Sequence, residues 1–265
     1  MDQTPERKDM TQVDFGARRV SPEEKKHLVQ EHFNTVAARY DLTNTLLSFG
    51  LQHLWKRRAV SWLGLKTGDR VLDACGGTAD LALLAAPAVG PGGRIVLYDF
   101  NRAMLARGHV KVVAAGLGNA ISFIQGDAEQ IALKDQSFDA AMVGFGIRNL
   151  ISMTQGLREL HRVLRPEGRL LILEFSQPTH SWFRALYDFY SFTIMPLVGK
   201  IMMGSWEAYT YLPQSIRLFP APAELSGILM GLGFAQVTHH PLSNGIAVVH
   251  LAHKPPAQEA SENQP

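Results

Sequence analysis

The chain has 265 residues, of which 46% are hydrophobic, so it is long enough and apolar enough to bury a core. Its 26 Lys and Arg residues nearly balance 24 Asp and Glu residues, and the net charge of +2 excludes a strong field that would recruit nucleic acid. A single cysteine, Cys75, excludes an internal disulfide, and no uninterrupted apolar run suits a membrane span, so a cytoplasmic location is expected.

Both ends of the chain are predicted to be disordered. Residues 1–20 mix charges without a period, and residues 255–265 form a polar tail that buries too little surface to offset its ordering entropy. Between them, residues 21–254 are expected to fold as a single domain that opens with a helical lid over residues 21–65.

The first predicted helix has a clear start signal. Ser21 is expected as the N-cap, with Pro22 in the first turn and Glu24 completing a capping box. Farther along the lid, the basic run Lys56, Arg57 and Arg58 is interpreted as a solvated helix face rather than a nucleic-acid patch.

From residue 70 onward, short apolar runs alternate with helical stretches, a pattern that predicts a doubly wound, Rossmann-like α/β fold with a mostly parallel sheet. The alternation pauses over about residues 180–220, an aromatic and Met-rich helical insertion or lid, and the chain closes with a helix and an antiparallel strand pair. The predicted strands are RVLDAC (70–75), GRIVLYDF (93–100), AISFIQGD (120–127), FDAAMVGFG (138–146), GRLLILEFS (168–176), a strand near 234–240 and GIAVVHLAHK (245–254).

The turn after the first of these strands, in VLDACGGTADLAL (71–83), suits a nucleoside better than a dinucleotide. Gly76 and Gly77 adjoin, and Asp80 stands where the third glycine of a dinucleotide fingerprint belongs. What remains is an acidic strand residue, Asp73, a turn of small residues that includes Thr78, and a helix N-terminus. A turn without the third glycine is poorly suited to binding a pyrophosphate.

Acidic residues follow the next two strands. Asp99 is placed to accept hydrogen bonds from ribose hydroxyls, and the carboxylate of Asp127 with the backbone of Ala128 is placed to contact an adenine. The outline of adenine, ribose and a charged tail without phosphates is that of S-adenosylmethionine (SAM). Taken singly, the residues have structural alternatives: Asp99 is an N-cap for the helix near Asn101, and Asp127 is a helix cap. Their order at successive strand ends favours the ligand.

No metal site is expected. His239, His240, His250 and His253 lie on or near the last strands but lack the spacing of a closed ligand set. Cys75 is interpreted as a small buried residue of the glycine turn, because nothing near it in the sequence marks a reactive thiolate.

Several segments together carry a resemblance to a known family: HFNTVAARYDLTNTLLSFGLQHLWKR, VLDACGGTADLA, YDFNRAML, GDAEQIALKDQSFD, FGIRNL, HRVLRPEGRLLILEFSQP and YLPQSIRLFP. From about Phe15 to Lys254 the sequence resembles the ubiquinone/menaquinone biosynthesis C-methyltransferases. The resemblance implies a class I SAM-dependent methyltransferase acting on a ring carbon of a polyprenylated benzoquinol or naphthoquinol, with cofactor contacts from the glycine turn (Gly76, Gly77, Thr78) and from Asp99, Asp127, Ala128 and Gly144.

Two positions depart from the family pattern inside the cofactor site. Ala79 replaces the last glycine of the turn and is expected to add a methyl group close to the cofactor tail. Gly144 stands where the family commonly has serine, so a contact there is expected from the backbone alone.

Methyl transfer to a quinol ring would give roles to residues after the fourth strand and in the lid. Arg148 is expected to stabilise a quinolate, Asn149 to orient its ring oxygen, and Tyr40 with Asp41 to close over the site. A water or the phenolate of a neighbouring tyrosine is expected to take the quinol proton. Two alternatives stay open: Arg148 pairs with Glu174, and Tyr40 only packs.

The expected partners follow from this substrate. Residues 182–203 are rich in aromatic, Leu, Ile and Met side chains and are interpreted as core, as a channel for the polyprenyl tail that opens toward a membrane surface, or as both. Self-association as a homodimer or within a quinone-biosynthesis complex is a further option. Two rival functions are a non-catalytic scaffold of such a complex and, less favoured because the pyrophosphate turn is absent, an NAD-dependent oxidoreductase.

Overall fold

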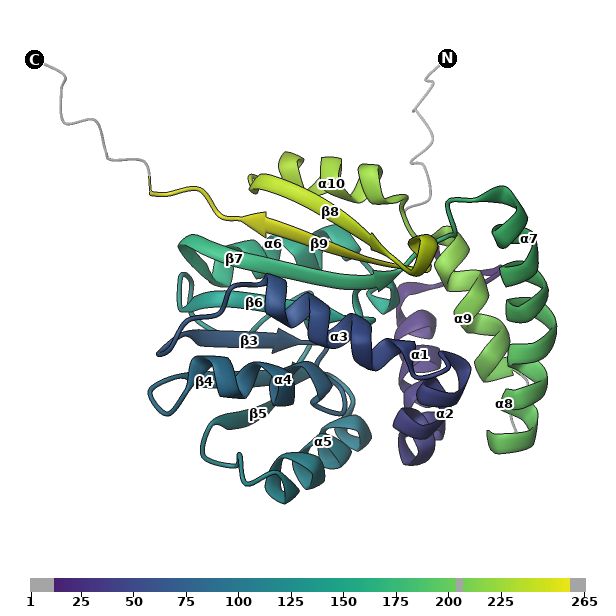
Figure 1. The fold of residues 1–265 in the computed structure, drawn as a ribbon, viewed down its shortest axis with the longest axis horizontal. Helices are drawn as coiled ribbons and strands as arrows, with labels where there is room; N and C mark the ends of the chain where they lie inside the picture. Colours follow the sequence, from purple (N-terminus) through teal and green to yellow (C-terminus); the bar gives the residue numbers. More distant parts are fainter. Residues whose placement is uncertain (1–11, 204–206, 258–265) are drawn as a thin grey trace, which may run out of the picture.

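The computed structural model describes residues 12–203 and 207–257, and Figure 1 shows their arrangement. The centre is a seven-stranded sheet in the order β5-β4-β3-β6-β7-β9-β8. Neighbouring strands pair in parallel except for β9, which runs antiparallel to both β7 and β8. This confirms the predicted doubly wound fold with its antiparallel C-terminal pair. The strands are β3 (Arg70–Ala74), β4 (Arg94–Asp99), β5 (Ile121–Gln125), β6 (Phe138–Gly144), β7 (Leu164–Phe175), β8 (Ala235–Leu242) and β9 (Ala247–His253).

Helices cover both faces of this sheet, which is why its strands are continuous apolar runs rather than alternating ones. Val71 of β3 packs into a core formed with α3, α4 and α5, and its neighbour Leu72 packs on the opposite face against α6 and α10. Both side chains are fully buried. The covering helices are α3 (Leu51–Trp62), α4 (Asp80–Val89), α5 (Arg102–Ala114), α6 (Met153–Val163) and α10 (Pro222–Gly231).

The N-terminal lid begins as the start signal predicts. Its elements are α1 (Pro22–Val36), a 3-10 turn (Ala37–Arg39) and α2 (Tyr40–Leu47), whereas α3, which the predicted lid also included, packs on the sheet. The Ser21 hydroxyl accepts a hydrogen bond from the Glu24 backbone N–H at 3.1 Å, so the N-cap is confirmed. The second half of the capping box is not formed, because the Glu24 carboxylate accepts a hydrogen bond from Arg18 at 3.4 Å.

The prediction of disorder over residues 1–20 is wrong for its last part. Val13–Phe15 (β1) and Arg18–Val20 (β2) form an antiparallel hairpin. The Phe15 ring stacks on Tyr211 at 4.3 Å between centroids, and the Ala17 N–H donates to the Gln214 side chain at 3.0 Å. A helix about two hundred residues away therefore supplies the burial that the local composition lacks. Residues 1–11 and 258–265, also predicted to be disordered, lie outside the described residues.

The segment after β7 is helical, as expected of an insertion. It comprises α7 (Ser181–Phe189), a π-helical turn (Tyr190–Ile194), α8 (Met195–Met203) and α9 (Glu207–Leu218). Figure 1 shows these helices beside α1 and α2, in a layer beyond the carboxyl ends of the parallel strands. Within residues 12–203 and 207–257, no helix combines the length and apolarity needed to cross a membrane.

Candidate active site

The glycine turn after β3 is braced by the carboxylate at the end of β4. The two Asp99 oxygens accept hydrogen bonds from the backbone N–H groups of Gly77 at 2.9 Å and Asn101 at 2.8 Å. Burial raises the pKa of Asp99 to about 6, although these two N–H groups pull it down. Gly76 has no room for a side chain, because an added Cβ would lie 2.7 Å from the Leu97 side chain. The turn therefore needs both its glycine and its acidic brace.

Asn101, and not Asp99, caps the helix that follows β4. The Asn101 side chain accepts a hydrogen bond from the Met104 N–H at 3.0 Å, which is the N-cap contact of α5. Interpreting Asp99 as the N-cap is therefore wrong, and its carboxylate instead serves the glycine turn.

A small cavity lies above this turn, at the carboxyl ends of β3, β4 and β6. Predicted cofactor residues Gly76, Gly77, Thr78, Asp99 and Gly144 are all part of its wall. The structure thus brings together residues from three separate strand ends, as expected at this edge of a doubly wound sheet.

Asp73 gives the small cavity a carboxyl group with an unused oxygen. Its side chain is fully buried, one oxygen accepts the Ala82 N–H at 3.0 Å, and the other has no hydrogen-bond partner within the described part of the chain. Burial raises the pKa of Asp73 to about 8. A buried, unsatisfied carboxyl on a cavity wall is suited to a cationic ligand group, such as an ammonium, that would restore its charge.

The two predicted departures from the family pattern have clear surroundings. Ala79 adopts the left-handed conformation, with a φ of 70°, but its fully buried methyl group does not line the cavity and lies against Gly108 of α5. The closeness of this methyl group to a cofactor tail stays a prediction. At Gly144 an added Cβ would lie 2.7 Å from the Leu81 side chain, so a serine there would require Leu81 to move.

The adenine-contact candidates lie apart from this cavity. Neither Asp127 nor Ala128 lines its wall. The Asp127 carboxylate accepts a hydrogen bond from Lys26 of α1 at 2.7 Å and one from the Glu129 N–H at 3.0 Å. The next element after β5 is the strand β6, so the helix-cap alternative is wrong for Asp127, whose carboxylate closes a turn instead. Its contact with adenine stays a prediction.

A second and larger cavity of about 440 Å³ lies between the lid and the helical insertion. Aromatic and aliphatic side chains of α1, α2, α3, α7, α8 and α9 form most of its wall. Among the described residues, four side chains line both cavities: Phe33, Tyr40, Phe145 and Asn149. The small and the large cavity therefore adjoin at one junction.

Arg148 stands on the wall of the larger cavity, in the 3-10 turn after β6 (Ile147–Asn149). Its Nη1 donates to Glu174 at 2.6 Å and to the Phe145 carbonyl at 2.7 Å, and both charged side chains are buried. The alternative pairing with Glu174 is therefore realised. Burial lowers the pKa of Arg148, but Glu174 outweighs it and the net pKa is raised, so the guanidinium stays charged. Its Nε–H lacks a partner among the described residues, which leaves a donor for a ligand.

Asn149 has its amide oriented by a tyrosine that sequence reasoning missed. The Tyr211 hydroxyl donates to Asn149 Oδ1 at 3.0 Å, and the Asn149 Nδ2 has no partner within the described residues. The amide group therefore has unused N–H donors at the junction of the cavities. Tyr211 lies in the segment YLPQSIRLFP, which carried the resemblance but gave no role to that hydroxyl.

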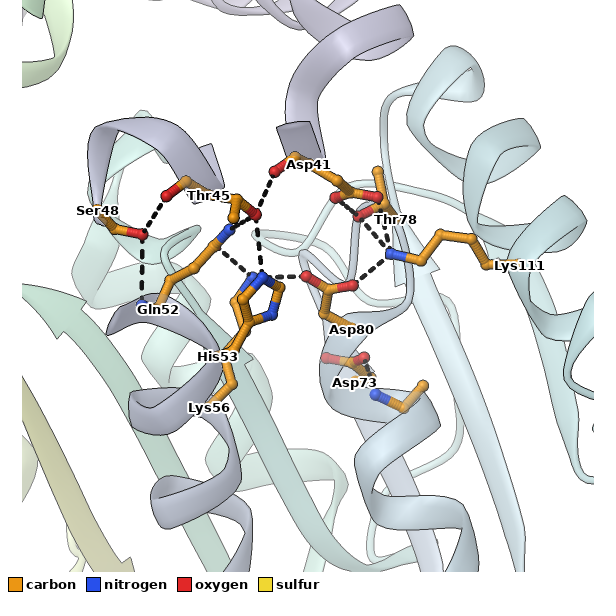
Figure 2. Close-up of polar contacts among 11 residues, drawn as sticks. Asp41, Thr45, Ser48, Gln52, His53, Lys56, Asp73, Thr78, Asp80 and Lys111 are labelled. Carbon is orange, nitrogen blue, oxygen red and sulfur yellow. Dashed lines mark hydrogen bonds and ion pairs between the residues drawn. The ribbon is translucent and has the colours of Figure 1, made fainter. Parts of the chain in front are cut away.

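An alternating network of charges ties the lid to the glycine turn, as Figure 2 shows. Asp41 of α2 accepts hydrogen bonds from Thr78 at 2.7 Å and from Lys111 of α5 at 2.8 Å. Lys111 also pairs with Asp80 at the start of α4, and Asp80 accepts a 2.6 Å hydrogen bond from Lys56 of α3. Lys56 is buried, so interpreting it as part of a solvated face is wrong for this residue, whereas Arg57 and Arg58 are exposed.

Comparison with known proteins gives a consistent result. The sequence profile of the ubiE/COQ5 methyltransferase family matches residues 6–254. The protein named ubiquinone/menaquinone biosynthesis C-methyltransferase UbiE from Pseudomonas fluorescens strain SBW25 is 43% identical over 241 residues, which cover 91% of this chain and 94% of that protein. The protein of the same name from Pseudomonas putida strain W619 has the same identity and coverage.

Solved structures share the fold at low sequence identity. A SAM-dependent methyltransferase from Aquifex aeolicus has a TM-score of 0.54 at 18% identity, over 88% of this chain and 98% of that one. A putative methyltransferase in complex with the Trm112 activator from Haloferax volcanii has a TM-score of 0.62 at 14% identity, over 87% and 99%. At this identity the likeness shows the fold alone.

The charge network predicts that Lys111 holds the lid closed. Lys111→Met should leave Asp41 without its cation and weaken the docking of α2 by about 1 kcal/mol, the scale of a partly exposed pair. Hydrogen exchange of the α2 amides should then be faster, by roughly fivefold. Arg107→Met, an exposed change one turn earlier on α5, is the matched control. Unchanged exchange in the Lys111 variant would show that the network does not restrain the lid.

Proposed function

The chain belongs to the ubiE/COQ5 methyltransferase family, and from that membership we propose that it methylates a ring carbon of a polyprenylated quinol in menaquinone or ubiquinone biosynthesis. It is a SAM-dependent methyltransferase. The proposed acceptors are demethylmenaquinol and 2-methoxy-6-polyprenyl-1,4-benzoquinol. The observation that carries the proposal is the junction where the small cavity with its buried carboxyl groups, at the strand ends, adjoins the large apolar one.

The residues around the small cavity suit SAM. The unsatisfied oxygen of Asp73 is available to the ammonium group of its amino-acid tail, and the N-terminus of α4 adds a favourable dipole for the carboxylate. Asp99 already accepts two backbone hydrogen bonds, but a carboxylate has lone pairs for about two more, which suits the ribose hydroxyls. Asp127 and Ala128 stay candidates for the adenine end. When bound, the cofactor supplies an electrophilic methyl group.

The larger cavity suits a quinol with a long apolar tail. A ring placed at the junction would have its oxygen near the Nε–H of Arg148 and the free amide of Asn149, both buried donors. Donors that are already oriented and desolvated stabilise a developing quinolate without reorganising. The apolar wall formed by α7 and α8 would accommodate the polyprenyl chain, while Tyr40 covers the junction from the lid.

We extend the proposal to a membrane surface as the source of the quinol. Side chains that line the larger cavity are also exposed: Phe49 by 79%, Leu186 by 57% and Phe189 by 59%. Trp182, 70% exposed, lies on the same helix as Leu186 and Phe189. Exposed aromatic and aliphatic side chains that continue into a cavity form an apolar mouth, and a polyprenyl tail leaving a bilayer can enter there without crossing water.

Purified protein supplied with SAM and a chemically reduced, short-chain demethylated quinol should give a ring-methylated product, detected by mass spectrometry. The same ring in its oxidised quinone form should not react, because it lacks the hydroxyl whose ionisation makes the ring carbon nucleophilic. Comparing a benzoquinol with a naphthoquinol identifies the preferred ring. Absence of methylation with both reduced rings would overturn the proposed function.

Arg148 is predicted to act in turnover more than in cofactor binding. Arg148→Lys keeps a cation beside Glu174 but loses the planar donor edge, so kcat should fall by about 100-fold while SAM affinity by calorimetry changes little. The double variant Arg148→Met with Glu174→Gln removes both charges and avoids an unpaired buried carboxylate. It should show the same loss. Wild-type turnover in both variants would assign the pair a structural role only.

The apolar mouth predicts binding to lipid vesicles. The wild-type protein should float with liposomes, and Trp182→Glu should reduce flotation because a charge cannot enter the interface at low cost. Val110→Glu, a change of an equally exposed apolar residue on α5, is the control and should float as the wild type does. A dimer in sedimentation that Trp182→Glu dissociates, without flotation, would instead assign the surface to a second copy of the chain.

A further inference from the structure

We infer that His32 of α1 is the proton acceptor of the methyl transfer, taking the proton from the quinol hydroxyl as the ring attacks the methyl group. This inference rests on the proposed function and assigns a catalytic base to that same site. His32 lines the larger cavity together with Arg148 and Asn149. Its ring lies against two aromatic neighbours, 5.2 Å from Phe33 and 5.5 Å from Tyr211 between centroids.

The wall of the larger cavity offers few groups that can take a proton. No Asp, Glu, Lys or Cys occurs among the described residues that line it. Its titratable side chains are His32, Tyr40, Arg148, Tyr187, Tyr190 and Tyr211, contributed by α1, α2, the turn after β6, α7, the π-helical turn and α9.

The tyrosines are protonated donors rather than bases. Burial raises the pKa of Tyr40, Tyr187 and Tyr211 to about 12, and it raises the pKa of Tyr190 as well. A tyrosine phenolate is therefore not available at neutral pH, which removes one of the two acceptors expected from the sequence. Arg148 stays protonated, since Glu174 keeps its pKa above the ordinary value.

His32 has the opposite property. Burial and, as the smaller cause, the nearby Arg148 cation together lower its pKa to about 4, so the imidazole is neutral at pH 7 with one nitrogen free of a proton. An acceptor with so low a pKa is weak while the cavity is empty. A quinolate changes this, because its negative charge between Arg148 and His32 stabilises an imidazolium and raises the pKa of His32 as the proton moves.

The proton balance of the step is complete without any further reagent. The quinol O–H bond breaks and its proton passes to the His32 ring nitrogen. The ring carbon forms a bond to the methyl group, and the S–CH₃ electron pair stays on sulfur, giving S-adenosylhomocysteine. The methylated carbon then loses its hydrogen as a proton to water, and the imidazolium returns its proton to the ring oxygen. One proton is released per turnover, and nothing is oxidised or reduced.

The test is the pH dependence of kcat in His32→Gln and His32→Phe, measured with SAM and a reduced demethylated quinol. Gln keeps a polar group of similar size, and Phe keeps a ring against Phe33 and Tyr211. At pH 7 both variants should lose about 100-fold in kcat, the usual contribution of a general base. The difference in kcat between the wild type and each variant should shrink from pH 6 to pH 9, because a growing fraction of the quinol is ionised without a base. His27→Gln, an exposed histidine on the same helix, is the control and should follow the wild type.

A second substrate distinguishes two causes of a lower kcat in the His32 variants: the loss of a base and the loss of packing. A chlorinated quinol has a more acidic hydroxyl, so its methylation should depend less on His32, and the gap between wild type and variant should shrink. An unchanged kcat, or a loss of the same factor at every pH and with both quinols, would overturn the assignment. A wild-type protein that methylates no quinol would instead overturn the proposed function, and with it this inference.

Discussion

The ion pair between Arg148 and Glu174 fixes the geometry on which the rest of the site depends. It joins the turn after β6 to the end of β7 at 2.6 Å, with both side chains buried. A buried ion pair is a poor stability device, because the cost of desolvating two charges roughly cancels their attraction and an apolar pair would serve as well. What it achieves is placement. The guanidinium is held on the cavity wall with one N–H unused, and the adjacent Asn149 reaches the junction.

The lid is attached by weaker interactions, and this difference suits its task. Cofactor and quinol both have to enter, so the elements above the sheet edge must separate and close again. The network of Asp41, Lys111 and Asp80 is partly exposed, and such pairs each contribute little. Because Thr78 of the glycine turn also donates to Asp41, a closed lid and an ordered turn support each other. The cavity is therefore bounded on one side by the rigid sheet edge with its buried ion pair and on the other by a weakly attached lid.

The sequence predicted the sheet well because its strands are short apolar runs bounded by turns. Failures occurred where a distant residue decides the outcome. The hairpin of β1 and β2 depends on Tyr211, and Lys56 is buried by its contact with Asp80. Neither partner is a neighbour in sequence. The catalytic and cofactor roles require a ligand in place, and they stay predictions.

The choice of base can be understood from what enters the cavity. A carboxylate beside Arg148 would form a second ion pair and hold the cation away from the ring oxygen, and it would add the cost of another buried charge. A neutral imidazole avoids both, since the empty cavity then carries only the charge of the compensated Arg148–Glu174 pair. The incoming quinol is neutral too. Charge separates only when the ring is in place, and at that moment the quinolate has a cation on either side.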